Sequence, residues 1–229
     1  MSNKILVVVT NHSKYPSLER ATGAWLGEIV HFANPLLAAG YELDFVSPKG
    51  GYVPMDPHSL TLADAQDWQW YQNPELMRAL GNTLSPEQVD ASQYQAIYYA
   101  GGHGVMWDFV DQPQLQRIAE QIYARGGWVS AVCHGVVGLL NLKQGEQWLL
   151  AGKQVTGFSD EEEQQLQLTE HVPFLTEQAL RARGGLFQAT EAWHPWVVSD
   201  QRLITGQNPG STALVAQQLL QELQGPSLS

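Results

Sequence analysis

The stretch Trp128-Val129-Ser130-Ala131-Val132-Cys133-His134-Gly135-Val136-Val137-Gly138 decides the fold and contains the only cysteine of the chain. Its first five residues have the apolar and small side chains of a buried strand, and residues 135–142 read as a small, apolar helix. Cys133 lies where strand becomes helix, and the small Ala131 and Gly135 let the two elements approach closely. This pattern predicts a nucleophile elbow, with Cys133 as the nucleophile rather than a buried structural cysteine. We also expect the helix N-terminus to lower the pKa of the thiol.

Apolar runs alternate with amphipathic segments along the rest of the chain. The runs expected as strands are 5–9, 43–46, 96–99, 151–158, 186–189, 196–198 and 203–205, and the segments expected as helices are 22–39, 114–125, 172–183 and 211–223. Pro35 suggests a kink or a break in the first helix. Such alternation predicts an α/β fold, with a mainly parallel sheet and helices on both faces, in the flavodoxin-like three-layer sandwich.

One domain is expected over residues 1–225, with 226–229 as a tail. Residues 48–92 are irregular and contain many Pro, Gly, Asp and Asn. They predict an insertion with a short helix at 74–80. This insertion is either a cap over the pocket or a surface excursion with no role, and the sequence favours neither.

Composition limits the partners and the compartment. The formal net charge is −11, from 12 Lys and Arg against 23 Asp and Glu. Such acidity speaks against nucleic acid and anionic membranes as partners. A single cysteine cannot form an internal disulfide, which favours a reducing compartment, and we expect a cytoplasmic protein. The run at 5–9 is too short for a signal-peptide core, and no stretch reaches the roughly 20 apolar residues that span a bilayer.

Five motifs occur in the order that one known family uses. They are Thr22-Gly23-Ala24-Trp25-Leu26-Gly27-Glu28, Ser47-Pro48-Lys49-Gly50-Gly51 with Pro54-Met55-Asp56-Pro57, Gly101-Gly102-His103-Gly104-Val105-Met106-Trp107-Asp108, Ala131-Val132-Cys133-His134-Gly135 and Thr205-Gly206-Gln207-Asn208-Pro209-Gly210-Ser211. Together they resemble the ThiJ/PfpI superfamily, also called class I glutamine amidotransferase-like, over nearly the whole chain. The Met-Trp-Asp form of the Gly-Gly-His-Gly loop and the chain length are similar to its branch of heat-shock chaperones and glutathione-independent glyoxalases.

The resemblance implies a catalytic group around Cys133. It makes His134 the base and Glu28, on the first helix, a partner of the thiol. Because Glu28 lies among apolar residues, its pKa should be raised. The acid that orients His134 would come from the run Asp160-Glu161-Glu162-Glu163. The resemblance favours Glu163, although an acidic first helical turn explains most of this run without catalysis.

Backbone groups and the remaining histidines complete the expected site. The N–H groups of Gly102 and His134 would form an oxyanion hole. His103 either lines the pocket or belongs to the turn. The Gly-Gly-His-Gly loop lacks dinucleotide-binding spacing, so no cofactor is expected. The other histidines show neither HExxH nor paired spacing, so no metal site is expected and we interpret them as surface or capping residues. These histidines are His12, His31, His58, His171 and His194.

Three hypotheses of function follow. The first, implied by the resemblance, is a cofactor-independent glyoxalase, a glyoxalase III-like lyase (D-lactate dehydratase). It would convert methylglyoxal, a small 2-oxoaldehyde, to lactate through a hemithioacetal on Cys133. The second is a cysteine amidase or peptidase that uses Cys133, His134 and Glu163. The third is a redox-responsive chaperone or stress protein in which Cys133 is oxidised. The resemblance also leads us to expect a homodimer.

Overall fold

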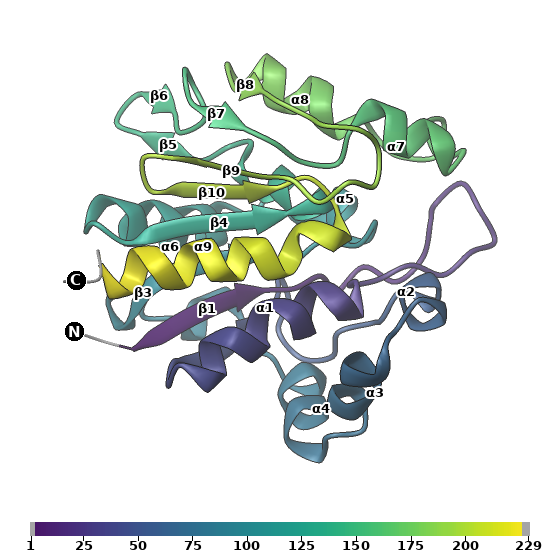
Figure 1. Cartoon of the computed structure of the whole chain (residues 1–229), viewed down its shortest axis with the longest axis horizontal. Helices are drawn as coiled ribbons and strands as arrows, with labels where there is room; N and C mark the ends of the chain where they lie inside the picture. The colour runs from purple at the N-terminus through teal and green to yellow at the C-terminus, as the bar shows by residue number, and fades with distance from the viewer. Residues whose placement is uncertain (1–2, 226–229) are drawn as a thin grey trace.

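The computed structural model describes residues 3–225, and a six-stranded sheet in the order β2-β1-β3-β4-β10-β9 forms its centre (Figure 1). The strands are β1 (Lys4–Val8), β2 (Glu42–Val46), β3 (Tyr94–Tyr99), β4 (Trp128–Val132), β9 (Val197–Asp200) and β10 (Leu203–Gly206). All neighbouring strands are parallel except β9, which pairs antiparallel with β10. The expected mainly parallel α/β sheet is therefore confirmed.

Helices cover both faces of this sheet. α1 (Leu26–Ala38) and α9 (Thr212–Gln224) pack together on one face, and α6 (Pro113–Ala124) packs on the other (Figure 1). In β1, Ile5 and Val7 join the core under α1 and α9, whereas Leu6 and Val8 join the core under α6. Successive strand side chains point to opposite faces, so a strand covered on both sides reads as a continuous apolar run.

α1 is held on the sheet by an aromatic pair and a hydrogen bond. Phe32 stacks on Tyr98 of β3 with ring centroids 3.5 Å apart. The Tyr98 hydroxyl donates to the backbone carbonyl of Glu28 at 2.8 Å. The helix continues through Pro35, where the sequence suggested a kink or a break. These contacts fix the first turn of α1, and with it Glu28, against the carboxyl end of β3.

Residues 48–92 form a helical insertion. It contains α2 (Pro57–Thr61), α3 (Ala65–Tyr71) and α4 (Pro74–Gly81), and two short 3₁₀ turns at 86–88 and 91–93. Figure 1 shows α3 and α4 below the rest of the molecule, on the same side of the sheet as α1. The helix expected at 74–80 is confirmed.

Two expected elements differ most from the structure, and the helices expected at 22–39 and 172–183 each begin four residues later, at Leu26 and Thr176. The segment after Cys133 is a 3₁₀ helix, η3 (Cys133–Leu139), rather than an α-helix over 135–142. The strand expected at 151–158 shrinks to β7 (Gln154–Val155), which pairs with β8 (Leu186–Phe187). On the side away from β8, the Gln154 N–H donates to Asp200 Oδ2 and the Thr156 N–H donates to the Thr205 hydroxyl, at 2.8 and 2.9 Å, so side chains of the β9–β10 hairpin replace a backbone ladder there.

The other elements are short or lie at the surface. β5 (Lys143–Gln144) and β6 (Gln147–Trp148) form a small hairpin, α5 (Val105–Asp108) follows the glycine loop, and α7 (Asp160–Gln165) precedes α8 (Thr176–Ala182). η4 (Pro209–Ser211) leads into α9. The tail expected at 226–229 lies outside the described residues. No helix in the part of the chain that the structure describes is long and apolar enough to cross a membrane.

Candidate active site

Cys133 follows β4 directly and has a backbone φ of 56°. A positive φ is uncommon for a residue with a Cβ, and surrounding packing must hold it. Such packing is present at Gly135, where the carbonyl oxygen of Tyr99 occupies the place that a Cβ would need. The predicted strand-to-helix elbow therefore exists, although a 3₁₀ helix leaves it. The Cys133 side chain is 2% exposed and lines a pocket at the carboxyl edge of the sheet.

Glu28 reaches Cys133 from the first turn of α1. Its side chain is fully buried, and its Oε2 accepts a hydrogen bond from the Gly101 N–H at 2.5 Å. The thiol of Cys133 is close enough to lower the pKa of this carboxyl, while Oε1 has no hydrogen-bond partner among the described residues. Burial raises the pKa of Glu28 to about 8, and the Gly101 N–H and the thiol offset only part of that increase. The expected raised pKa is confirmed, and the carboxyl holds its proton at neutral pH.

The expectation of a low thiol pKa is wrong. Burial, followed by the charge of Glu28, raises the pKa of Cys133 well above that of a free thiol. The backbone N–H of His134 opposes this effect without overcoming it. A short 3₁₀ helix offers little dipole to assist, because its few peptide units are poorly aligned. Glu28 and Cys133 thus titrate as a coupled pair that holds two protons at neutral pH.

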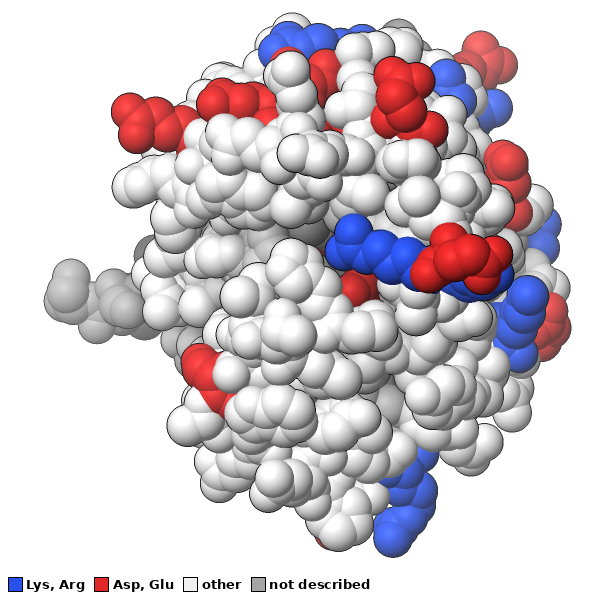
Figure 2. Space-filling model, turned by 90° about the vertical axis from the view of Figure 1, so that its right-hand side faces the viewer, with Lys and Arg blue, Asp and Glu red and all other residues white. Residues whose placement is uncertain are grey.

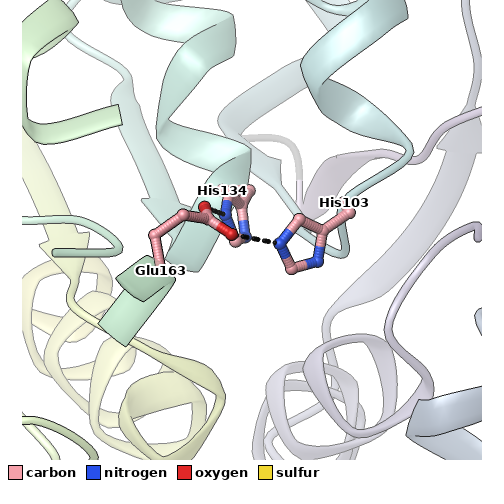
Figure 3. A group of neighbouring side chains, drawn as sticks. All are labelled: His103, His134 and Glu163. Carbon is pink, nitrogen blue, oxygen red and sulfur yellow. Dashed lines mark hydrogen bonds and ion pairs between the residues drawn. The ribbon is translucent and has the colours of Figure 1, made fainter. Parts of the chain in front are cut away.

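A buried carboxylate joins two histidines on the other side of the thiol (Figure 3). Glu163 of α7 accepts a hydrogen bond from His134 Nε2 at 2.7 Å and another from His103 Nε2 at 2.8 Å. His134 Nδ1 lies 3.4 Å from Cys133 Sγ. Because a carboxylate only accepts, Nε2 of His134 carries the hydrogen and Nδ1 presents its lone pair to the sulfur. The imidazole therefore has the tautomer that a base needs.

Charge within this group is set by burial and by close contacts. Burial opposes the charged form of Glu163, but the adjacent His134 and His103 outweigh it and hold its pKa below the usual range. Burial, then the neighbouring His134, lowers the pKa of His103 to about 4. A charged Glu163 with a neutral His103 is thus the stable arrangement at neutral pH.

The structure distinguishes between the four acids at the start of α7. Ser159 caps this helix, and Glu162 completes the capping box, as expected for an acidic first turn. The carboxylate of Glu162 also accepts hydrogen bonds from Asn208 Nδ2 and Gln207 Nε2, and so anchors the segment before α9. Among these four acids, Glu163 makes the contact with His134.

The backbone groups expected to form an oxyanion hole border the pocket. The His134 N–H lies beside the thiol and lowers its pKa. Gly102 lines the pocket with a φ of 98°, and a Cβ there would collide with the carbonyl oxygen of Gly23. This position requires glycine both for its backbone conformation and for its space. The role of the two N–H groups stays a prediction.

The pocket has a volume of about 330 Å³ and a mostly aromatic and apolar wall. Besides the residues described above, its lining includes Arg20, Trp25, His58, Leu62, Phe158, Leu166 and Trp193. His58 lies in α2 and Leu62 directly follows that helix, so part of the insertion borders the site. Figure 2 looks onto this side of the molecule, where a hollow opens between largely uncharged surfaces with charged side chains at one edge. A small, weakly polar molecule fits such a site.

His103 is the site residue that sequence reasoning left undecided. It is 5% exposed, lies 4.0 Å from His134 between ring centroids, and shares Glu163 with it. Its position in the Gly-Gly-His-Gly loop gave no direction for its side chain. A pairing with an acid 60 residues away depends on the three-dimensional fold.

Comparisons with known proteins agree with this geometry. The chain is 32% identical to the glutathione-independent glyoxalase HSP31 of Saccharomyces cerevisiae over 221 residues, which cover 91% of this chain and 92% of that protein. It superimposes on the rapid encystment protein of Francisella tularensis with a TM-score of 0.94 at 35% identity, covering 97% and 99% of the two chains. The Candida albicans glyoxalase III structure matches with a TM-score of 0.87 at 29% identity, covering 95% of each chain.

The profile of the DJ-1/PfpI family matches residues 21–222. That range contains both flanks of the site, from Glu28 on α1 to the Asn208 segment before α9. The expected relationship is confirmed, and the chain belongs to the DJ-1/PfpI family.

Proposed function

We propose that the protein is a cofactor-independent glyoxalase that isomerises a 2-oxoaldehyde such as methylglyoxal and releases the 2-hydroxy acid, lactate. Two relatives, one named as a glutathione-independent glyoxalase and one as glyoxalase 3, support this reaction class. The observation that carries it is the fully buried carboxyl of Glu28, which holds its proton at neutral pH and lies beside the only cysteine. A hydrolase needs a thiol and a base, whereas an isomerase also needs a group that moves a proton between two carbons.

The reaction starts with the thiol of Cys133. The form of the pair that holds one proton is the reactive one. Its proton rests mainly on the sulfur, because the pKa of Glu28 lies below that of the thiol, and transfer of this proton to the Glu28 carboxylate gives the thiolate. The thiolate attacks the aldehyde carbon, and the C–O π electrons move to oxygen, where the N–H groups of Gly102 and His134 face the new charge. Glu28 then donates its proton to this oxygen. The product of the step is a hemithioacetal, and Glu28 is left as a carboxylate.

Glu28 then transfers a proton along the substrate. Its carboxylate removes a proton from the former aldehyde carbon, the electrons of that C–H bond form the enediol double bond, and the π electrons of the adjacent keto group move to its oxygen. The same carboxyl returns the proton to the adjacent keto carbon, while His134 relays the hydroxyl proton between the two oxygens. The enediol becomes the lactoyl thioester of Cys133. No external oxidant or reductant is required, because one carbon is oxidised as the other is reduced.

Hydrolysis closes the cycle and uses His134. Its Nδ1 takes a proton from water, the resulting hydroxide attacks the thioester carbonyl, and Cys133 leaves as the thiolate. Glu163 holds the imidazole in the required tautomer and stabilises its positive charge. Because the wall of the pocket is apolar, water competes poorly with the aldehyde in the first step.

The hydrolase alternative is favoured by one observation, the line of contacts from Cys133 through His134 to Glu163. Two substrates separate the reactions: lactate is measured from methylglyoxal without glutathione, and ammonia from small amides. We expect lactate from the wild type, none from Cys133→Ala, and no ammonia from either protein. Amide hydrolysis by the wild type without lactate formation would replace the glyoxalase proposal with the hydrolase. We also propose a cytoplasmic location. We further propose a homodimer, and sedimentation of the purified chain would check that oligomeric state.

A further inference from the structure

A second cluster of possible ligands lies outside the pocket, between α1 and α3. His31 Nε2 is 3.2 Å from Asp67 Oδ1 and 3.3 Å from Asp64 Oδ2. One ligand atom from each of the three side chains lies within 4.8 Å of the other two. The sequence showed no such site because one ligand is on α1 and the other two are at the start of α3. From these contacts we propose a divalent transition-metal site, with zinc as the reference ion, formed by His31, Asp64 and Asp67.

The carboxylates are oriented by bonds that leave one oxygen of each free. Asp64 Oδ1 accepts the N–H of Asp67 at 2.8 Å, and Asp67 Oδ2 accepts the N–H of Asp64 at 3.1 Å. This reciprocal capping box holds both side chains at the start of α3. The two remaining oxygens, Asp64 Oδ2 and Asp67 Oδ1, are the ones near His31. Backbone groups thus act as the supporting shell that orients metal ligands.

The facing atoms are at contact distance without hydrogen-bond geometry. Asp67 Oδ1 and His31 Nε2 are buried atoms that have no hydrogen-bond partner among the described residues. The Asp67 side chain is only 5% exposed, so water does not readily supply the hydrogen bond that this carboxylate oxygen lacks. A buried carboxylate oxygen with no donor is costly and calls for an explanation. A metal ion between the two atoms would explain their missing partners, because it accepts a lone pair from each.

Charge leads to the same conclusion. Two carboxylates outweigh a single imidazole even when that imidazole is protonated. His31 and Asp64 line a surface cavity whose other described lining residues include amides such as Gln66, Gln69 and Asn73 but no Lys or Arg. Among the described residues, no lysine or arginine makes an ion pair with either aspartate. A divalent cation bound to neutral His31 and two carboxylates gives a neutral cluster.

The distances suit a small transition metal. Ligands at about 2.0–2.1 Å from a tetrahedral zinc ion lie about 3.3 Å from each other, close to the two measured separations. An imidazole ligand disfavours magnesium and calcium, which prefer oxygen. Three protein ligands leave a fourth position, which opens on the cavity for water. Since His31 lies one turn after Glu28 on α1, the ion would fasten the insertion to the helix that carries Glu28.

Zinc binding by the full chain tests the proposal. The protein is stripped with a chelator, dialysed against micromolar zinc, and its metal content measured for the wild type, His31→Gln, Asp67→Asn and Asp64→Asn. We expect one equivalent of zinc per chain in the wild type and none in His31→Gln or Asp67→Asn. Asp64→Asn, which changes a half-exposed side chain, should weaken binding at least tenfold with the fold intact by circular dichroism.

Two controls identify the site. Glu163→Gln removes the other described histidine–carboxylate cluster, and His171→Gln removes a histidine that bonds to Ser17. Both control variants should still bind one equivalent of zinc. Zinc at 100 times its dissociation constant should also raise the Tm of the wild type by about 5–11 °C, and that of His31→Gln much less. The proposal is overturned if the wild type binds no zinc, or if the equivalent survives Asp67→Asn and disappears in Glu163→Gln.

Discussion

Glu28→Gln should make the protein more stable while it removes activity. Glutamine has the shape of the protonated carboxyl, its carbonyl accepts the Gly101 N–H, and its amide donates toward the sulfur. It cannot take up a proton, so the proposed shuttle fails. Loss of one general acid–base group costs about 10²–10⁴ in rate. The gain in stability arises because the native state must keep Glu28 protonated, whereas the unfolded chain ionises it freely.

The magnitude follows from the two pKa values. Burial raises the pKa of Glu28 from 4.5 to about 8, so the folded state binds more protons between these values. Stability therefore falls as pH rises from about 4.5 toward 8. At pH 7 the cost is about 2.5 units at 1.36 kcal/mol each, or about 3 kcal/mol, and at pH 5 it is below about 1 kcal/mol. Glu28→Gln removes this cost.

Urea unfolding at pH 5 and pH 7 measures the effect. Relative to the wild type, Glu28→Gln should gain about 3 kcal/mol at pH 7, near 6–12 °C in Tm, and less than about 1 kcal/mol at pH 5. Glu161→Gln, at an exposed position of α7, is the matched control and should change stability by less than about 0.5 kcal/mol at either pH. A gain that does not vary with pH, or a loss of stability at pH 7, would refute the reasoning.

Three further predictions concern the rest of the site. Glu163→Gln should cost about 2–3 kcal/mol above pH 5, since one charge-assisted bond to a histidine is lost. This cost should shrink as pH falls toward the low folded pKa, and a pH-independent value in denaturant titrations would count against it. The rate of Cys133 alkylation by iodoacetamide, plotted against pH, should have its midpoint above the free-thiol value of roughly 8.5 in the wild type and at a lower pH in Glu28→Gln. Equal midpoints in the two proteins would contradict the coupled pair. Mild peroxide should convert Cys133 to the sulfinate, because no second cysteine resolves a sulfenate, and mass spectra that show methionine oxidation first would argue against a reactive thiol and against a redox role.

Periodicity was sufficient for the parts of the fold that depend on local pattern. β4 occupies Trp128–Val132 as predicted, because a strand buried on both faces leaves an apolar run with small neighbours. The burial of Glu28 followed from its apolar neighbours on α1. The strand predicted at 151–158 was too long because apolar character indicates burial but not pairing: only Gln154–Val155 pair with β8, and on the other side the Thr156 N–H bonds to the Thr205 side chain instead of a backbone carbonyl.

The chemistry of the site was harder to predict than its residues. The expected low thiol pKa relied on the N-terminus of an α-helix, but the helix is 3₁₀ and burial dominates. His103 was left open because its partner, Glu163, lies far along the chain. The cluster around His31 was missed for the same reason. Contacts between distant segments depend on topology, which spacing in the sequence does not express.

The covalent intermediate tests the central claim most directly. Wild-type protein is mixed with methylglyoxal without glutathione, quenched at short times, and the peptide that contains Cys133 is weighed by mass spectrometry. The proposed reaction predicts a transient adduct with the mass of one methylglyoxal molecule on Cys133, decaying as lactate appears. In Glu28→Gln the adduct should form and persist without lactate. Lactate released by the wild type with no adduct on Cys133, or released at the wild-type rate by Cys133→Ala, would contradict the account.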